Sequence, residues 1–363
     1  MEYCVNLLKT LVERESFWLR QKADSFLDKK FVIFPAGQTA RAFYHTLKEN
    51  YEIEAEFFID NNPALKGQNI HGKPIKISPW ESMDLSEYAI LVPTIPKFNK
   101  QIVAQLDGLG YNNYMHADAF CTCMLWKRYN AVASMLADDE SRLSYWGAIY
   151  MLLTGDNKFI RYSGEQYFSI KEFTRNEFDV IVDAGAFVGD TVEEYVKRGV
   201  EGVKIYAFEP FEEALRKLKG RLQRLKNEWP LANEDITIIP AGVAETSGRI
   251  NFSVANGAML KPNESGRESE GESIEVFSLD DFFKDKPPFT LLKADIEGGE
   301  LGMLKGAEKM IKEHRPKMTL SIYHSPFDFA RIAEFVHQLV PEYRMYVRTH
   351  TGEIRETILY CVI

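Results

Sequence analysis

The sequence predicts an α/β protein in which two doubly wound, Rossmann-like domains follow one another along the chain. Short apolar runs rich in β-branched residues, typical of strands buried on both faces, alternate with amphipathic helical segments. Twice, such a run leads through a glycine-containing turn into a helix, at residues 31–50 and 179–199. The chain of 363 residues is also too long for one ordinary domain. We expect a Rossmann-like domain over residues 1–125, a helical connector over 126–170 and a second doubly wound domain over 171–363.

The first domain is expected to open with a helix over residues 1–28, where apolar residues recur at helical spacing. Residues 61–74 are rich in turn-forming types and predict an exposed loop. Only Gly37 remains in the first turn, so a dinucleotide site is weakly indicated. The other expected elements are strands at 31–34, 56–59 (ending at Asp60) and 89–92, and helices at 40–50 and 101–109.

Residues 121–170 read as a helical connector, because residues 137–155 combine a capping Asp or Ser with a long apolar stripe. The aromatic segment Gly164–Phe168 follows, just before the second sheet. It either lines the mouth of a ligand site or seals the domain edge. We favour sealing, because aromatic side chains usually serve packing.

The second domain is predicted to carry five buried strands, an inserted hairpin and a closing hairpin whose last strand is antiparallel. A polar loop at residues 261–272 joins the two halves of the inserted hairpin. The expected elements are strands at 180–182, 203–208, 236–239, 291–293 and 318–322, hairpins at 249–279 and 344–363, and a helix at 301–314.

Composition and charge narrow the class of protein. The hydrophobic content of 45% and charged content of 27% are typical of a globular protein, and the net charge of −9 argues against a general nucleic-acid binder. The four cysteines have no zinc spacing and suggest no disulfide framework. The N-terminus lacks the pattern of a signal peptide, and no apolar run reaches the roughly 20 residues that span a bilayer. A cytoplasmic enzyme is therefore expected.

The turn after residues 180–182 carries the most informative chemistry. It reads Asp183-Ala184-Gly185-Ala186-Phe187-Val188-Gly189-Asp190, and the following residues predict a helix that Asp190 is placed to cap. A dinucleotide fingerprint has three glycines and binds pyrophosphate, but Asp183 and Asp190 would repel phosphate. Acidic groups suit a cation or an amino group, such as the sulfonium amino acid of S-adenosylmethionine. The alternative is a structural turn with a capping Asp.

Two further strand ends fit the same cofactor. Glu209-Pro210 follows the second strand of the domain, where a carboxylate holds a ribose diol. Ala241, Gly242 and Val243 follow the third strand, and their small size allows an adenine ring to approach. The alternative for these three residues is a tight turn that needs Gly242.

The motifs VIVDAGAFVGDT, YAFEP, LLKADIEGGELGMLKGA and SIYHSPFDF together resemble an FkbM-type methyltransferase over residues 130–363. The resemblance implies the seven-stranded class I fold of S-adenosylmethionine-dependent methyltransferases. It also implies O-methylation, commonly of a sugar or polyketide hydroxyl. By position, Glu209 should then take the ribose hydroxyls and Ala241–Val243 should edge the adenine. The residues implied around the methionyl part are Asp183, Gly185, Phe187, Gly189 and Asp190.

An alcohol acceptor must lose a proton, so a nearby base accelerates the transfer. Asp295 and His324 are the candidates, at the ends of neighbouring strands, and Lys293 and Glu297 are candidates to orient the substrate. Alternatively, Asp295 caps the helix that begins near Gly299, and His324 is a hydrogen-bonded turn residue. No metal site is expected at Asp295, Glu297 and His324, because carboxylates are common at such positions without metal.

The first third of the chain resembles the small Rossmann-like domains that precede catalytic domains in some bacterial sugar-modifying enzymes. The matching segments are PAGQTARAF and FFIDNNPALKGQNIHGKPI. The resemblance implies a nucleotide or nucleotide-sugar ligand. A docking or homodimerisation module with an empty pocket is an equally good interpretation, because fold does not fix function.

We therefore expect an S-adenosylmethionine-dependent O-methyltransferase acting on a sugar or glycan hydroxyl, in the setting of polysaccharide biosynthesis. The partners expected are a small-molecule or glycan acceptor, without nucleic acid and without a membrane span. Two alternatives remain. One is an NAD-linked nucleotide-sugar oxidoreductase that uses the first domain, and the other is a non-catalytic sugar-binding or scaffold protein.

Overall fold

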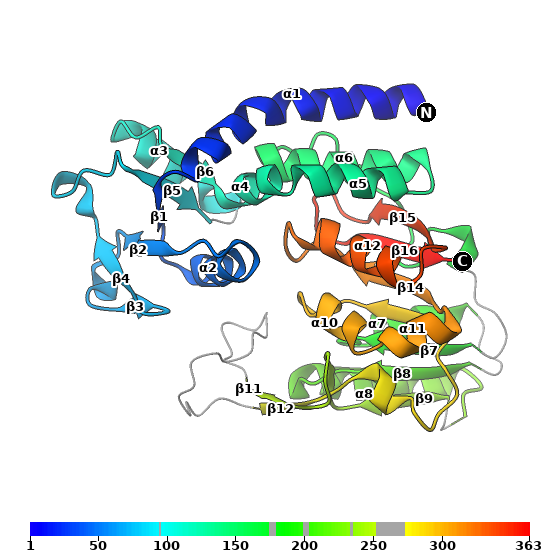
Figure 1. Ribbon diagram of the computed structural model, residues 1–363. Helices are drawn as coiled ribbons and strands as arrows, with labels where there is room; N and C mark the ends of the chain where they lie inside the picture. The colour runs from blue at the N-terminus through cyan, green and yellow to red at the C-terminus, as the bar shows by residue number, and fades with distance from the viewer. Residues whose placement is uncertain (94–95, 174–178, 199–202, 233–234, 252–272) are drawn as a thin grey trace. The chain divides into compact units, whose positions relative to one another are not determined.

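The computed structural model describes residues 1–93, 96–173, 179–198, 203–232, 235–251 and 273–363 (Figure 1). The chain divides into two compact units. The N-terminal unit comprises residues 2–128 and 146–159, and the C-terminal unit comprises residue 1, 129–145 and 160–363. Each unit holds a mixed sheet with helices, so the predicted α/β class and the tandem of doubly wound folds are confirmed.

The N-terminal unit is built on a six-stranded sheet with the order β3-β4-β2-β1-β5-β6. All neighbouring strands pair in parallel except β3, which is antiparallel to β4. The sheet strands are β1 (Lys30–Ile33), β2 (Ala55–Asp60), β3 (Asn69–Ile70), β4 (Lys73–Ile77), β5 (Tyr88–Val92) and β6 (Tyr114–His116). The helices are α1 (Glu2–Phe26), α2 (Gln38–Tyr51), α3 (Pro96–Gly108) and α4 (Ala117–Met124).

Two edge regions of this sheet differ from the sequence-based expectation. The segment 61–74 is not simply an exposed loop, because it includes β3 and leads into β4, whose Ile75 is buried and pairs with Phe58. Strand β6 was not expected at all. Strands of two to five residues are too short to show a period-2 pattern, so the pairing partner decides their structure.

The connector begins with α5 (Trp126–Met135) and α6 (Asp139–Thr154). Helical structure then stops, and the chain from residue 155 to residue 170 follows turns and bends. The expectation of a helical connector is therefore right up to Thr154 and wrong beyond it, where Gly155 adopts a left-handed conformation that ends the helix.

The C-terminal unit contains a seven-stranded sheet with the order β15-β16-β14-β13-β7-β8-β9. Strand β16 runs antiparallel to both of its neighbours, which confirms the predicted antiparallel last strand. The central strands are fully buried because helices cover both faces. The strands are β7 (Val180–Ala184), β8 (Lys204–Phe208), β9 (Ile236–Ile239), β13 (Leu291–Ala294), β14 (Lys317–Ser321), β15 (Arg344–Thr349) and β16 (Thr357–Val362).

A small three-stranded sheet, ordered β10-β12-β11, adjoins this fold. Strands β11 and β12 pair antiparallel, as expected for the inserted hairpin, whereas residues 252–272, including the predicted loop 261–272, lie outside the described residues. Its strands are β10 (Gly242–Val243), β11 (Gly248–Asn251) and β12 (Ser273–Phe277). The helices of the unit are α7 (Asp190–Lys197), α8 (Glu212–Glu228), α9 (Leu279–Phe282), α10 (Glu300–Lys305), α11 (Glu308–His314) and α12 (Asp328–Leu339).

Two helix ends differ from the prediction. Gly189, not Asp190, is the N-cap of α7, and Asp190 is the first helical residue. The helix expected over 301–314 is divided at Gly306, where an added Cβ would lie 2.1 Å from the Ala244 carbonyl oxygen. Among the described residues, no helix has both the length and the apolar character needed to cross a membrane.

Candidate functional site

The register of the seven-stranded sheet aligns polar side chains in a row across its centre. Asp183 on β7 pairs with Lys293 on β13, Lys293 with Thr319 on β14, and Thr319 with Tyr360 on β16. Paired residues of neighbouring strands point to the same face of a sheet. All four side chains are buried, so this polar row lies inside the fold. Its charged groups must therefore be paired with other protein groups.

Lys293 and Asp183 form the charged part of this row. The Lys293 Nζ lies 2.9 Å from Asp183 Oδ1 and donates a hydrogen bond of 2.7 Å to the Gly185 carbonyl oxygen. Burial alone would lower the pKa of Lys293, but the carboxylates of Asp183 and Asp295 raise it, so the ammonium stays charged. Lys293 therefore ties the end of β7 and the following turn to β13.

The turn after β7 can be formed only with glycine. Gly185 has φ +76°, and a Cβ there would lie 1.9 Å from the Asp295 carbonyl oxygen. Gly189 has φ +81°, and its added Cβ would meet Leu218 Cδ1 at 2.5 Å. Between them, Phe187 adopts a left-handed φ of 46° and its ring is 59% exposed, while Ala186 is buried. The turn thus brings backbone, and no side chain, close to β13.

Glu209 holds this turn from the end of β8. Its two carboxylate oxygens accept hydrogen bonds of 2.9 Å from the backbone N–H groups of Phe187, in the turn after β7, and of Phe211, which follows Pro210. Burial raises the pKa of Glu209, and the two N–H donors oppose that effect. The carboxylate expected at the second strand end is therefore present, and it organises the backbone of the turn.

Ala241, Gly242 and Val243 follow β9 after Pro240. Ala241 is buried, and its N–H donates to the Ile239 carbonyl at 2.8 Å. Gly242 and Val243 form β10, which pairs in parallel with Val276 and Phe277 of β12. The pairing with β12, rather than a left-handed turn, accounts for the small residue at Gly242, because an added Cβ would lie 3.2 Å from Val276 Cγ1.

Asp295 and His324 meet at the carboxyl ends of β13 and β14, together with two further acids that follow Asp295. The His324 Nε2 lies 3.0 Å from Asp295 Oδ1 and 3.2 Å from Glu300 Oε1, and its Nδ1 lies 3.8 Å from Glu297 Oε2. We call these four residues the His324 cluster. The sequence analysis considered Asp295, Glu297 and His324 together but did not include Glu300.

The acids control the charge of this cluster. Burial would lower the pKa of His324, but hydrogen bonding to Asp295 and Glu300 raises it to about 11. Burial would raise the pKa of Asp295, but the contact with His324 and the charge of Lys293 lower it to about 2. With these contacts, His324 is an imidazolium at neutral pH and has no free lone pair to accept a proton.

Tyrosine hydroxyls complete the surroundings of Asp295. Tyr323 donates to Asp295 Oδ1 at 3.1 Å, and Tyr167 donates to Oδ2 at 3.3 Å. Tyr167 belongs to the aromatic segment for which sealing was favoured. Its neighbour Phe168 does pack against Tyr195, but Tyr167 faces the candidate site. The hydroxyl of Tyr167 was the sequence signal for a role in the site, because a buried tyrosine hydroxyl usually finds a hydrogen-bond partner.

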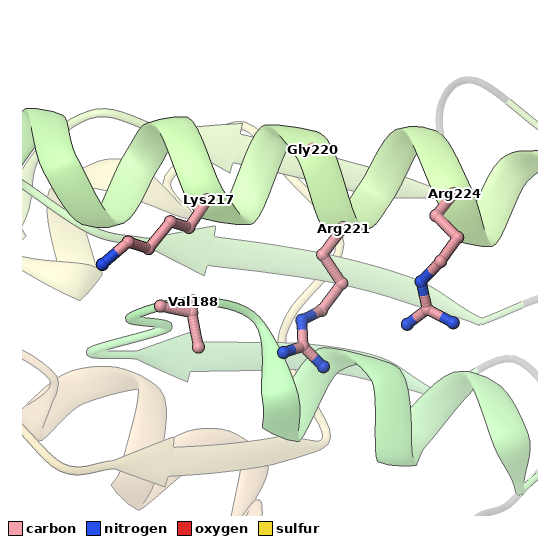
Figure 2. Close-up of a pocket in the computed structure, with 5 residues that line it drawn as sticks. All are labelled: Val188, Lys217, Gly220, Arg221 and Arg224. Atoms are coloured by element: carbon pink, nitrogen blue, oxygen red, sulfur yellow. The ribbon is translucent and has the colours of Figure 1, made fainter.

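A surface hollow of about 440 Å³ lies beside the same turn, lined by Val188 and by residues of α8 (Figure 2). In the figure, Lys217, Arg221 and Arg224 extend from α8 toward the segment that carries Val188. Arg221 and Arg224 both pair with Glu193, and the bond from Arg224 contributes most to lowering the pKa of Glu193 to about 2. Arg221 and Arg224 are therefore engaged in ion pairs within the fold.

Comparison with known proteins identifies the fold and the domain. The profile of the methyltransferase FkbM domain matches residues 183–357, whereas no curated protein matches the chain. A crystal structure of methyltransferase FkbM from Methylobacillus flagellatus KT is 19% identical, with a TM-score of 0.60 over 98% of this chain and 100% of that one. The likeness extends through both units and establishes a shared fold.

Two further solved structures are less similar. Precorrin-6y C5,15-methyltransferase from Geobacter metallireducens GS-15 is 14% identical, with a TM-score of 0.31 over 57% of this chain and 94% of its own. An rRNA methylase from Streptococcus thermophilus is 16% identical, with a TM-score of 0.33 over 52% of this chain and 88% of its own.

The matched domain, residues 183–357, contains the glycine turn, Glu209 and the whole His324 cluster. Residues 183–357 of this chain are a methyltransferase domain of the FkbM family.

Proposed function

We propose that this protein transfers a methyl group from S-adenosylmethionine to a hydroxyl group of a sugar or glycan. The observation that carries the proposal is the acidic glycine turn from Asp183 to Asp190, clamped by Glu209 at the carboxyl ends of β7 and β8. Ligands bind at this edge of doubly wound sheets, at the point where the strand order reverses. Here β7 is that point, with β8 on one side and β13 on the other.

The residues present fit this cofactor. Asp190 and Glu209 make the turn a poor phosphate site and a suitable one for a positively charged ligand with a ribose diol, whereas the charge of Asp183 is compensated by Lys293. The Gly185 backbone can be approached closely because no side chain stands there. We propose Asp183, Gly185, Ala186, Phe187, Gly189 and Asp190 for the methionyl side. Glu209 and Pro210 are proposed for the ribose, and Ala241, Gly242 and Val243 for the adenine.

Bound S-adenosylmethionine supplies an already activated methyl group, so the chain's task is to align an acceptor oxygen with it. Asp295 and His324 adjoin the turn and are proposed to hold the acceptor hydroxyl. Lys293 is buried against Asp183 and Gly185, so we propose that it acts by positioning the turn. The Asp295 carboxylate is the proton acceptor that the charge state favours, because His324 is already protonated.

A carbohydrate acceptor is supported by the side chains near the carboxyl ends of the strands. Phe187 and Phe211 both expose their rings next to the Glu209 clamp. Aromatic faces pack against the apolar face of a sugar ring, and carboxylates accept hydrogen bonds from its hydroxyls.

The N-terminal unit repeats the same carboxylate clamp. Asp60, at the end of β2, accepts hydrogen bonds from the backbone N–H groups of Ala36 at 2.9 Å and Asn62 at 2.8 Å. The pattern matches that of Glu209. In both units, one N–H donor lies in the turn after the first strand, and the other lies two residues after the acid itself. We propose a nucleotide or nucleotide-sugar ligand for this unit, with homodimerisation as the second candidate role.

The affinity for S-adenosylhomocysteine, measured by titration calorimetry, tests the cofactor assignment. We expect Glu209→Gln to weaken binding roughly 10- to 150-fold, since a charged hydrogen-bond acceptor contributes roughly 1.5–3 kcal/mol. Glu212→Gln, an exposed acid in the first turn of α8, is the matched control and should bind like the wild type. Unchanged affinity in Glu209→Gln would remove the ribose assignment. Transfer of labelled methyl to a panel of nucleotide-sugars and lipid-linked glycans then tests the acceptor class.

A further inference from the structure

We propose that Asp295, Glu300 and His324 bind one divalent cation of the Mg²⁺ and Mn²⁺ class. The three residues come from different elements. Asp295 follows β13, Glu300 is the first residue of α10, and His324 lies three residues after β14. One ligand atom from each falls within 4.8 Å of the other two. The sheet therefore brings together two carboxylates and an imidazole that the sequence separates by up to 29 residues.

The separations are those of neighbouring ligands around one ion. Mn²⁺ and Mg²⁺ bind oxygen and nitrogen ligands at about 2.1 Å, so two ligands at a right angle stand about 3.0 Å apart. The His324 Nε2 lies 3.0 Å from Asp295 Oδ1 and 3.2 Å from Glu300 Oε1. The same spacing also suits N–H···O hydrogen bonds, so distance alone does not distinguish a cation from a proton.

The state of Glu300 favours the cation. Its side chain is fully buried and its carboxylate faces His324 Nε2, with Oε1 also accepting a hydrogen bond of 2.9 Å from the Ile296 N–H. Within the described part of the chain, Oε2 has no hydrogen-bond partner. Leaving a buried carboxylate oxygen unpaired is costly, and a cation held by both oxygens of Glu300 would remove that cost.

Neighbouring groups already orient the proposed ligands. Tyr323 donates to Asp295 Oδ1 at 3.1 Å, and the Ile296 N–H fixes Glu300. The second ring nitrogen of His324 faces the carboxylate of Glu297 at 3.8 Å. Such outer contacts set the orientation of metal ligands, and an acid next to the free nitrogen of a ligating histidine is common.

Charge and donor type define the class of ion. The His324 cluster contains three acids and one imidazole, and Tyr323 links Asp295 to a fourth acid, Glu356, at 3.3 Å. Carboxylate oxygens with one nitrogen suit Mg²⁺ or Mn²⁺ better than a thiophilic ion. A cation here would displace the proton from His324 and bind its neutral Nε2. On the proposed function, the cation would also lower the pKa of the acceptor hydroxyl.

Titration of the whole chain with Mn²⁺ tests this site. The protein is first treated with a chelator, which is then removed, and free Mn²⁺ is measured by electron paramagnetic resonance during the titration. We expect one Mn²⁺ per chain in the wild type and at least tenfold weaker binding in Glu300→Gln, which retains the shape and an acceptor for Ile296. Glu308→Gln is the matched control. This acid stands in the first turn of the next helix, pairs with the exposed Lys312, and should leave Mn²⁺ binding unchanged.

Should Glu300→Gln fail to fold, Asp295→Asn replaces it, because the Asp295 side chain is 22% exposed and tolerates an isosteric change better. Absence of saturable Mn²⁺ binding to a cooperatively folded wild type would overturn the proposal. Equal binding by Glu300→Gln and Glu308→Gln would overturn it too. Binding of S-adenosylhomocysteine is measured in parallel, so loss of the cofactor assignment and loss of the metal site give different results.

Discussion

At the scale of single residues, the ion pair of Lys293 and Asp183 determines how variants of the glycine turn after β7 can be interpreted. Removing one partner of a buried ion pair leaves an uncompensated charge and costs about 3–5 kcal/mol. We expect Asp183→Asn to lower the free energy of unfolding by that amount, measured by urea denaturation, because Lys293 is 3% exposed. Loss of cofactor binding in such a variant would then report on folding as well as on the pocket.

The double variant Asp183→Asn, Lys293→Met separates these effects. It removes both charges, so we expect it to recover at least half of the stability lost in the single variant. Glu342→Gln breaks the exposed pair with Arg315 and should change stability by less than about 0.5 kcal/mol. Equal stability of Asp183→Asn and wild type would contradict the assignment of a structural ion pair.

The positions of the candidate residues could be predicted where strand ends determine them. Glu209, Asp295 and His324 follow apolar strands and Asp183 lies near the end of one, and parallel strands bring their carboxyl ends to one edge. The pairing of Lys293 with Asp183 depends on the register of strands about 110 residues apart, which local patterns do not encode. Glu300 was missed because an acid at the start of a helix is already explained by its favourable interaction with the helix dipole.

At the scale of elements, residues 162–169 form a strap that carries Tyr167 over the polar row. The hydroxyl of Tyr360 accepts hydrogen bonds from the Tyr167 N–H at 3.0 Å and from Ser169 Oγ at 3.1 Å. It donates to His350 Nε2 at 2.8 Å, because burial lowers the pKa of His350 and keeps the ring neutral. The hydroxyl of Tyr360 therefore holds the strap at Tyr167 and Ser169, while His350 Nδ1 bonds to the Ser163 carbonyl oxygen at 2.7 Å.

Tyr360→Phe should release this anchor. We expect a loss of about 1–3 kcal/mol in the free energy of unfolding, because the buried Tyr167 N–H is left unpaired. Hydrogen exchange of residues 163–169 should become faster, while exchange in β13 stays slow. Tyr162→Phe, on the same strap with a side chain that is 71% exposed, is the control. Unchanged exchange of the strap in Tyr360→Phe would show that other contacts hold it.

Elements with long apolar runs were predicted well, because burial on both faces leaves a pattern in the sequence. All five main strands of the C-terminal unit and the closing hairpin fall where expected. Short strands such as β3 and β6 were missed, since their structure depends on the neighbouring strand. The division of the predicted helix at Gly306 follows from its close approach to Ala244, a contact that local sequence does not reveal.

At the scale of the whole molecule, the two units have separate sheets and separate candidate ligands. A ligand that binds only the folded state stabilises it by about 2.7 kcal/mol at one hundred times its dissociation constant. S-Adenosylhomocysteine should therefore slow hydrogen exchange in β7, β8 and α7 of the C-terminal unit. The strands β1, β2 and β5 of the N-terminal unit should exchange as in the free protein, because the proposed cofactor site contains none of their residues.

A panel of nucleotide-sugars should show the opposite pattern if the Asp60 clamp serves a ligand, with slower exchange in β1 and β2. Asp60→Asn should abolish that protection and leave the response to S-adenosylhomocysteine intact, since Glu209 provides the equivalent clamp in the other unit. Protection of the N-terminal strands by S-adenosylhomocysteine would contradict this division of labour. Protection of neither unit by any nucleotide-sugar would instead favour a docking role for residues 2–128, because a folded sheet with a formed clamp would then have no ligand.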